Sequence, residues 1–154
     1  MQIKSNYKKL ILIQLIGILH CFEEYFFGFS DWATRHFGTT TQSWFFLSHL
    51  FIFIGLGILA FYAYKGNKLG IFFSFVVQII LFTNGLFHIV TTIVWQEYSP
   101  GVITQILIVP ITYIVFRGIK KNKFLSAKEI NYALLVGCII SALIIASLWI
   151  DVPV

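Results

Sequence analysis

The chain carries, from Leu10 to Phe27, the stretch LILIQLIGILHCFEEYFF. This stretch is almost wholly apolar as far as His20, and Glu23 and Glu24 follow within four residues. An ionisable side chain inside a membrane-spanning helix is costly to bury and marks a candidate functional site. The stretch therefore predicts both a spanning helix and a place where ligand binding or chemistry occurs.

The composition of the whole chain indicates a membrane protein. Of its 154 residues, 58% are hydrophobic and 11% are charged, whereas soluble domains contain about 45–50% apolar and about 25% charged residues. The formal net charge of +5 could suggest a nucleic-acid partner, but the basic residues fall in short segments between apolar runs. That distribution favours orientation in a lipid bilayer and predicts no nucleic-acid partner.

Five apolar stretches are candidates for membrane spans. A spanning helix needs about 20 mostly apolar residues, and the alternating pattern of a membrane barrel is absent. We therefore predict an all-α protein, a bundle of five transmembrane helices that forms one domain over residues 1–154. The predicted spans are residues 9–29, 43–64, 69–95, 102–116 and 130–150.

The basic residues also predict the orientation of the bundle. Ten of the 11 Lys and Arg residues lie on one side of the five predicted spans, and Arg35 is the exception. Because Lys and Arg concentrate in cytoplasmic loops, we expect the N-terminus in the cytoplasm and the C-terminus outside. The four tryptophans fall near the outer ends of their spans, which predicts an interfacial aromatic belt.

Polar side chains within the first four predicted spans lie at a similar depth. A rise of about 1.5 Å per residue places those of the first three spans between the membrane midplane and the outer leaflet. Residues four apart on a helix share one face, so two of these helices each present a polar pair. The set comprises His20, Glu23 and Glu24 on the first helix, His49 on the second, and Asn84 and His88 on the third, with Gln105 on the fourth as a supporting residue.

Three histidines and two carboxylates form a mixed nitrogen and oxygen set that suits zinc, iron or manganese. We expect a divalent metal ion bound by His20, His49, His88 and either Glu23 or Glu24, with the remaining glutamate acting as general base. The leading hypothesis is a metal-dependent integral membrane enzyme. It would hydrolyse or oxidise a small lipophilic substrate that enters from the outer half of the bilayer.

Two further hypotheses use the same residues. In the first, a buried glutamate with a raised pKa donates a proton, and the protein is a metal-free, isomerase-like enzyme acting on a lipid or terpenoid. In the second, Glu23 and Glu24 alternate in protonation, and the protein is a proton or metal transporter or a sensor. Five helices are few for alternating access, so this hypothesis predicts a homo-oligomer.

The pentapeptide HCFEE at residues 20–24 has the pattern His-x-x-Glu-Glu. With this pattern in its first helix, the chain resembles the family of small bacterial integral membrane proteins named for the HXXEE motif. Chain length, helix number, the Asn84…His88 pair and the Pro100-Gly101 turn are also similar. The resemblance implies a multi-pass protein of the bacterial inner (plasma) membrane. The function of that family is unassigned, so the resemblance implies no activity.

Overall fold

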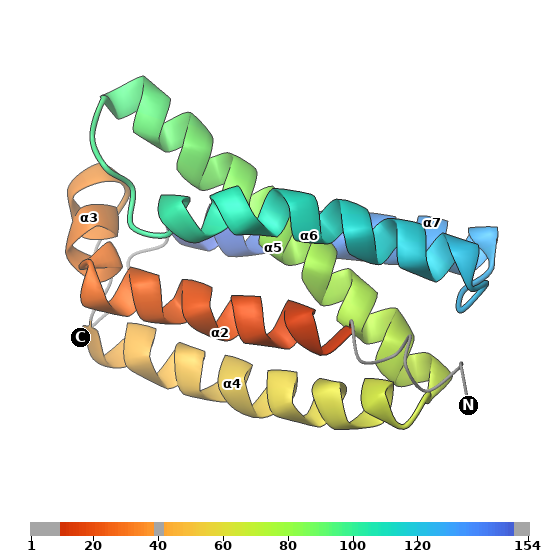
Figure 1. Ribbon diagram of the computed structural model, residues 1–154. Coiled ribbons are helices and arrows are strands. Elements are labelled where there is room, and N and C mark those ends of the chain that lie inside the picture. Colours follow the sequence, from red (N-terminus) through yellow and green to blue (C-terminus); the bar gives the residue numbers. More distant parts are fainter. Residues whose placement is uncertain (1–9, 39–41, 150–154) are drawn as a thin grey trace.

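The computed structural model describes residues 10–38 and 42–149, and every regular element within this part of the chain is a helix (Figure 1). The all-α prediction is therefore confirmed. The helices are α2 (Ile11–Phe26), α3 (Phe29–His36), α4 (Gln42–Tyr64), α5 (Lys68–Trp95), α6 (Val102–Lys121) and α7 (Ala127–Ser147).

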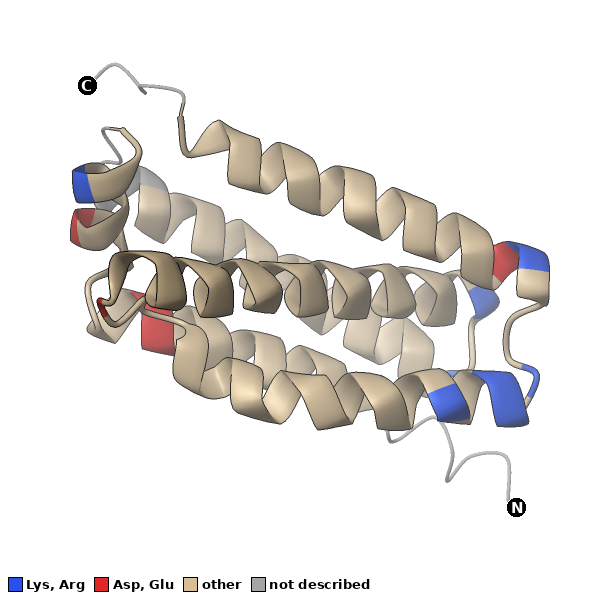
Figure 2. Ribbon diagram, turned by 90° about the horizontal axis from the view of Figure 1, so that it is seen from above, with Lys and Arg blue, Asp and Glu red and all other residues tan. Residues whose placement is uncertain are grey.

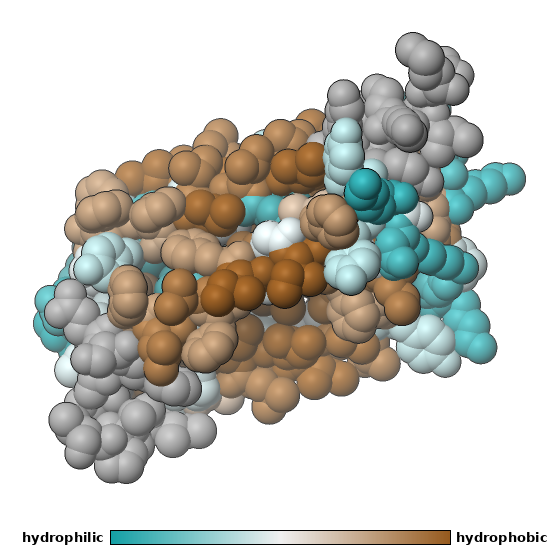
Figure 3. Space-filling view, turned by 90° about the horizontal axis from the view of Figure 1, so that it is seen from below, coloured by the Kyte–Doolittle hydropathy of each residue, from teal (hydrophilic) through white to brown (hydrophobic). Residues whose placement is uncertain are grey.

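Four of the helices, α4 to α7, are long and apolar enough to cross a membrane. The pair formed by α2 and α3 meets the same test as one span, although the two helices are bent by 69° relative to each other. The five predicted spans thus correspond to four straight helices and one broken pair. Figure 3 shows the apolar band that these helices present, with hydrophilic residues at both ends of the molecule.

Helix α5 is the centre of the bundle. It packs against α4, α6 and α7, and it runs obliquely to the other long helices (Figure 1). Its apolar residues Phe75, Val76 and Ile79 join the main hydrophobic core. Polar contacts add to this packing, because Gln14 of α2 donates a hydrogen bond of 2.9 Å to Ser74 of α5. The bundle therefore surrounds one helix that carries two of the predicted site residues.

The first span differs from the prediction at its outer end. Helix α2 ends at Phe26, and Gly28 adopts φ = 75°, a left-handed conformation that glycine tolerates without strain. The chain then turns into α3, so the stretch expected to be an outer loop is helical. Trp32 of α3 is only 2% exposed and packs on Phe29 and Phe45. It belongs to a buried aromatic cluster, and its predicted place in an interfacial belt is wrong.

The fourth span is longer than predicted, and the fifth begins and ends earlier than predicted. Helix α6 continues beyond residue 116 to Lys121, where long basic side chains can reach past the apolar region. Helix α7 begins before residue 130, because Ser126 and Glu129 form a capping box that starts it at Ala127. The Ser-x-x-Glu pattern in the sequence was a signal for this earlier start.

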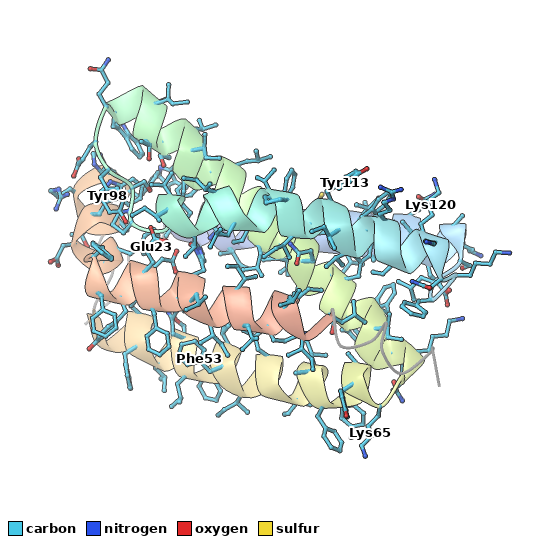
Figure 4. The ribbon with its side chains drawn as sticks, in the orientation of Figure 1. Glu23, Phe53, Lys65, Tyr98, Tyr113 and Lys120 are labelled. Carbon is cyan, nitrogen blue, oxygen red and sulfur yellow. The ribbon has the colours of Figure 1, made fainter. Side chains whose placement is uncertain are left out.

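Lysine and arginine residues gather at one end of the bundle (Figure 2), whereas Arg35 belongs to α3, which lies at the other end (Figure 1). Lys65, which follows α4, and Lys120 of α6 mark this basic end (Figure 4). The predicted orientation depends on this unequal distribution of Lys and Arg between the two ends of the bundle.

Candidate functional site

The predicted polar residues of three helices converge near the end opposite the basic one. His20 and Glu24 lie one turn apart on α2, and Asn84 and His88 lie one turn apart on α5. His20, Glu24 and His88 are buried, whereas His49 of α4 is partly buried. The packing of α2 against both α4 and α5 brings these side chains to one point.

Glu24 is the centre of this group. Its Oε1 lies 3.4 Å from Nε2 of His20 and 3.2 Å from Nε2 of His88. Its Oε2 lies 3.0 Å from Nε2 of His49. The amide nitrogen of Asn84 lies 2.9 Å from Nε2 of His20 and 3.2 Å from Nε2 of His88. One carboxylate thus faces three imidazoles, each through its Nε2 atom.

The other ring nitrogen of His20 is held by α6. The Thr104 hydroxyl donates to the Gly101 carbonyl at 3.0 Å, so its oxygen accepts from Nδ1 of His20 at 2.8 Å. The Gln105 amide nitrogen, itself a donor, lies 3.3 Å from the same Nδ1. In the tautomer that the Thr104 contact favours, Nδ1 carries the hydrogen and the Nε2 lone pair of a neutral His20 is on the side of Glu24 and Asn84.

His49 and His88 are oriented in a similar way. Nδ1 of His49 donates to the Phe45 carbonyl at 2.7 Å, and Nδ1 of His88 lies 2.8 Å from the Ser99 hydroxyl. Histidines that bind metals have this arrangement, in which a protein oxygen holds one ring nitrogen and the other nitrogen faces the ion. All three imidazoles are therefore fixed by partners outside the cluster.

Glu23 makes a different set of contacts from its neighbour Glu24. Its Oε1 accepts hydrogen bonds from the Tyr98 hydroxyl and from the backbone N–H groups of Gly101 and Ile103, at 2.7, 3.0 and 2.9 Å. Its Oε2 accepts from the Thr104 N–H at 2.7 Å. Figure 4 shows Glu23 and Tyr98 near each other at this end of the bundle. Glu23 caps the start of α6, where free N–H groups and the helix dipole favour a negative charge.

The structure therefore divides the predicted residues into two sets. It brings together His20, Glu24, His49, Asn84 and His88, with Gln105 beside His20. It directs the Glu23 carboxylate to the backbone of α6.

Gly101 packs directly against two of the imidazoles. A Cβ at this position would lie 2.8 Å from Cε1 of both His20 and His88, and the residue has φ = 114°. Both the close approach and the backbone conformation require glycine. The sequence analysis identified the Pro100-Gly101 turn but missed this contact, and it missed Ser99 as a partner of His88.

The residues could hold a metal ion on either side of Glu24. Ligand atoms of His20, Glu24 and His88 lie within 4.8 Å of one another, and so do those of Cys21, Glu24 and His49. A tetrahedral ion with bonds of about 2.0–2.1 Å has neighbouring ligand atoms about 3.3 Å apart, close to the spacing found around Oε1. The first group is buried throughout, so an ion there would be shielded from bulk water.

A cavity of about 510 Å³ adjoins the cluster. His20, Glu24, His49 and Asn84 line it at one end, and aliphatic side chains of α4, α5 and α7 line most of the remainder. The polar cluster is therefore accessible from an apolar space inside the bundle.

A family model described as "protein of unknown function with HXXEE motif" matches residues 11–115. The chain belongs to this HXXEE family. The matched region runs from α2 into α6 and contains all the predicted site residues. In this HXXEE protein, His20, Glu23 and Glu24 are the three residues that fit the motif. No curated protein and no solved structure matches the chain.

Proposed function

We propose that this HXXEE protein is a metal-dependent integral membrane enzyme. A divalent ion would be held by Nε2 of His20, Nε2 of His88 and Oε1 of Glu24. The observation that supports the proposal is the convergence of these three atoms while Nδ1 of each imidazole is held by another residue.

The electrostatics of the cluster favour a cation at this point. The Asn84 amide nitrogen lies within hydrogen-bond distance of Nε2 of both His20 and His88, and donation to both requires these two nitrogens to be unprotonated, so that neither can donate to the Glu24 carboxylate. Within the described residues, the ion pairs of Glu24 are with histidines alone. A buried carboxylate needs a positive partner or a proton. A metal ion that took the two Nε2 lone pairs in place of the Asn84 N–H groups would also supply the positive partner of the carboxylate.

Three protein ligands would leave at least one coordination position open, which is the arrangement of catalytic sites. The ion would act as a Lewis acid and lower the pKa of a bound water. His49, whose Nε2 contacts Oε2 of Glu24 and which lines the cavity, is placed to accept a proton. Zinc in this set suits hydrolysis, whereas iron or manganese suits oxidation.

In this proposal the general base is His49, whereas the sequence predicted that the glutamate that does not bind the metal would have this role. Glu23 accepts four hydrogen bonds at the start of α6, which commits both of its oxygens to positioning that helix. Its capping also fixes Thr104, which holds His20. The motif would then contain two metal ligands and one positioning residue.

The substrate in this proposal is a small lipophilic molecule, because the cavity beside the cluster is mainly apolar. We also propose the bacterial inner (plasma) membrane as the location, with the basic end of the bundle in the cytoplasm. The cluster would then lie in the outer half of the bilayer.

Elemental analysis of the purified protein tests the proposal. We expect about one zinc, iron or manganese ion per chain, lost in His88→Ala and retained in His36→Ala. His36 is the matched control because it pairs with Glu97 on the outer side. Wild-type protein that neither retains a metal nor binds one when it is added would refute the proposal.

A metal-free acid/base enzyme is the second candidate, and one contact favours it. Nε2 of His49 lies 3.0 Å from Oε2 of Glu24, which is the distance of a direct hydrogen bond. A protonated imidazole beside a carboxylate is a usable proton donor. Nitrogen NMR of 15N-labelled histidines in chelator-treated protein distinguishes the two candidates. A His49 imidazole protonated on both nitrogens favours the metal-free enzyme. Neutral imidazoles whose nitrogen shifts change when zinc is added favour the metal site.

A further inference from the structure

The cavity beside the Glu24 cluster has two chemically different parts. Its polar end is formed by the cluster, by Ser48 of α4 and by Ser141 and Ser147 of α7. Ser141 accepts a hydrogen bond from Thr83, the neighbour of Asn84, so the lining residues between 141 and 148, with Ile144 and Ile145, lie at this end. Away from the cluster, the walls are aliphatic and come from two helices. These wall residues are Ile52, Leu56 and Leu59 of α4 and Val77, Ile80 and Leu81 of α5. A site with one polar end and long apolar walls is complementary to an amphiphile.

The cavity is elongated along the helices. On α4 its lining begins at Phe45, and the part from His49 of the cluster to Leu59 spans about 15 Å at about 1.5 Å per residue. On α5 it extends from Asn84 back to Val77, or about 10 Å by the same rise. Its volume of about 510 Å³ lies within the range of small-molecule sites, roughly 300–1,000 Å³. These dimensions suit a single hydrocarbon chain better than a lipid with two chains.

The cavity lies between helices that contact the bilayer. Only 11% of the α4 span and 17% of the α7 span are buried, compared with 50% of the α5 span. Helices α4 and α7 each pack on α5 and supply walls of the same cavity. A chain leaving the bilayer between them would reach the cavity without crossing a polar surface.

We propose that this cavity binds one hydrocarbon chain of a single-chain amphiphile, with an oxygen-bearing head group at Glu24, His49 and Asn84. The chain lies along the aliphatic walls toward the basic end of the bundle. The role of the head group as substrate rests on the proposed function, but the chain-binding site stands on the cavity alone. The proposal thus narrows the substrate class to fatty acids, fatty alcohols and related single-chain compounds.

A photoreactive fatty acid tests where the chain lies. The probe is dodecanoic acid with a diazirine on its terminal carbon, added to the purified protein in lipid nanodiscs and illuminated. We expect peptide mass spectrometry to find the label near Leu56, Leu59 and Val77. Labelling spread over the outward-facing residues Phe51 and Ile58, with no enrichment at the cavity, would overturn the proposal.

Two glycines of α4 provide a matched pair of variants. Gly55 lines the cavity, whereas Gly57 is exposed and is not part of the cavity lining. A Cβ at either position meets no atom within 4 Å, so both sites accept a side chain. We expect Gly55→Phe to reduce cavity labelling at least about tenfold and Gly57→Phe to leave it unchanged. Equal labelling of both variants would overturn the proposal.

Metal content measured on the same samples separates the two proposals. Both variants lie away from the proposed ion, so we expect both to retain it. Cavity labelling in a metal-free wild type would uphold the chain site and refute the metal enzyme. A stoichiometric metal with uniform surface labelling would uphold the metal site and refute the chain site.

Discussion

Nε2 of His88 lies 3.2 Å from Oε1 of Glu24, with both side chains buried where α2 meets α5. The two residues come from helices that are distant in sequence, and Asn84 and His20 complete the same contact region. The His-x-x-Glu-Glu motif of α2 is therefore one part of a site that α5 completes. The predictions below test what holds the site together and what it binds.

Removal of the partner of His88 should weaken metal binding. In Ser99→Ala, Nδ1 of His88 loses the hydroxyl that lies 2.8 Å away. Loss of such an outer partner lowers metal affinity about 10–100-fold. A competition titration with a chromogenic chelator measures the change, and Ser147→Ala, whose hydroxyl bonds only the Ile144 carbonyl among described partners, is the control. Equal affinity in both variants would contradict the arrangement.

A methyl group at residue 101 should disturb the site directly. In Gly101→Ala the new Cβ would press on Cε1 of His20 and His88 at a backbone φ of 114°. Gly28→Ala also has a positive φ but meets no atom within 4 Å, so it isolates the cost of backbone strain. Both variants should lose stability, by about 1–2 kcal/mol, but only Gly101→Ala should lose metal affinity. If the two variants bind metal equally, Gly101 does not support the imidazoles.

Neutralising the Glu23 side chain should destabilise the bundle without removing the metal. In Glu23→Gln, the amide would present N–H groups to backbone donors such as Ile103 and Thr104. We expect a loss of about 2 kcal/mol, the cost of leaving buried hydrogen-bonding groups unsatisfied. Thermal unfolding in detergent measures the stability, and Tyr98→Phe, which removes one of the four bonds, should cost less. Loss of metal in folded Glu23→Gln protein would instead place Glu23 among the ligands.

The outer end of the protein should loosen in acid. His36 and Arg35 of α3 bind Glu97, beyond α5, and hold the pKa of that carboxyl below its ordinary value. A lowered pKa means that the stabilisation is present at neutral pH and is lost as the pH falls below about 4.

Hydrogen exchange of the α3 amides checks this pH dependence. Protection should decrease below about pH 4 in the wild type, whereas Glu97→Gln should show weaker protection at neutral pH and little further change. A wild type whose α3 protection is independent of pH would contradict the role of Glu97.

The sequence predicted most of the cluster because depth along a helix follows from residue number. His20, His49, Asn84 and His88 were placed in one layer by helical rise, and the structure brings them together around Glu24. The approximate spans were also predictable, since an apolar run of about 20 residues has few alternatives in a membrane.

The different contacts of Glu23, which caps α6, and Glu24, which faces the imidazoles, were not predictable from helical rise. Consecutive helical residues point about 100° apart, so the two carboxylates flank His20 and meet different neighbours. Which neighbour each one meets depends on the packing of α6 against α2, and this packing is set by contacts distant in sequence. The bend at Gly28 and the burial of Trp32 depend on similar contacts.

X-ray absorption at the metal edge of the purified, metal-loaded protein tests the central claim most directly. We predict a first shell of nitrogen and oxygen ligands at about 2.0–2.1 Å for zinc, with the outer scattering of two imidazoles, in both the wild type and His36→Ala. A shell without imidazole scattering, or a His88→Ala variant that retains the wild-type shell, would contradict an ion held by His20, Glu24 and His88.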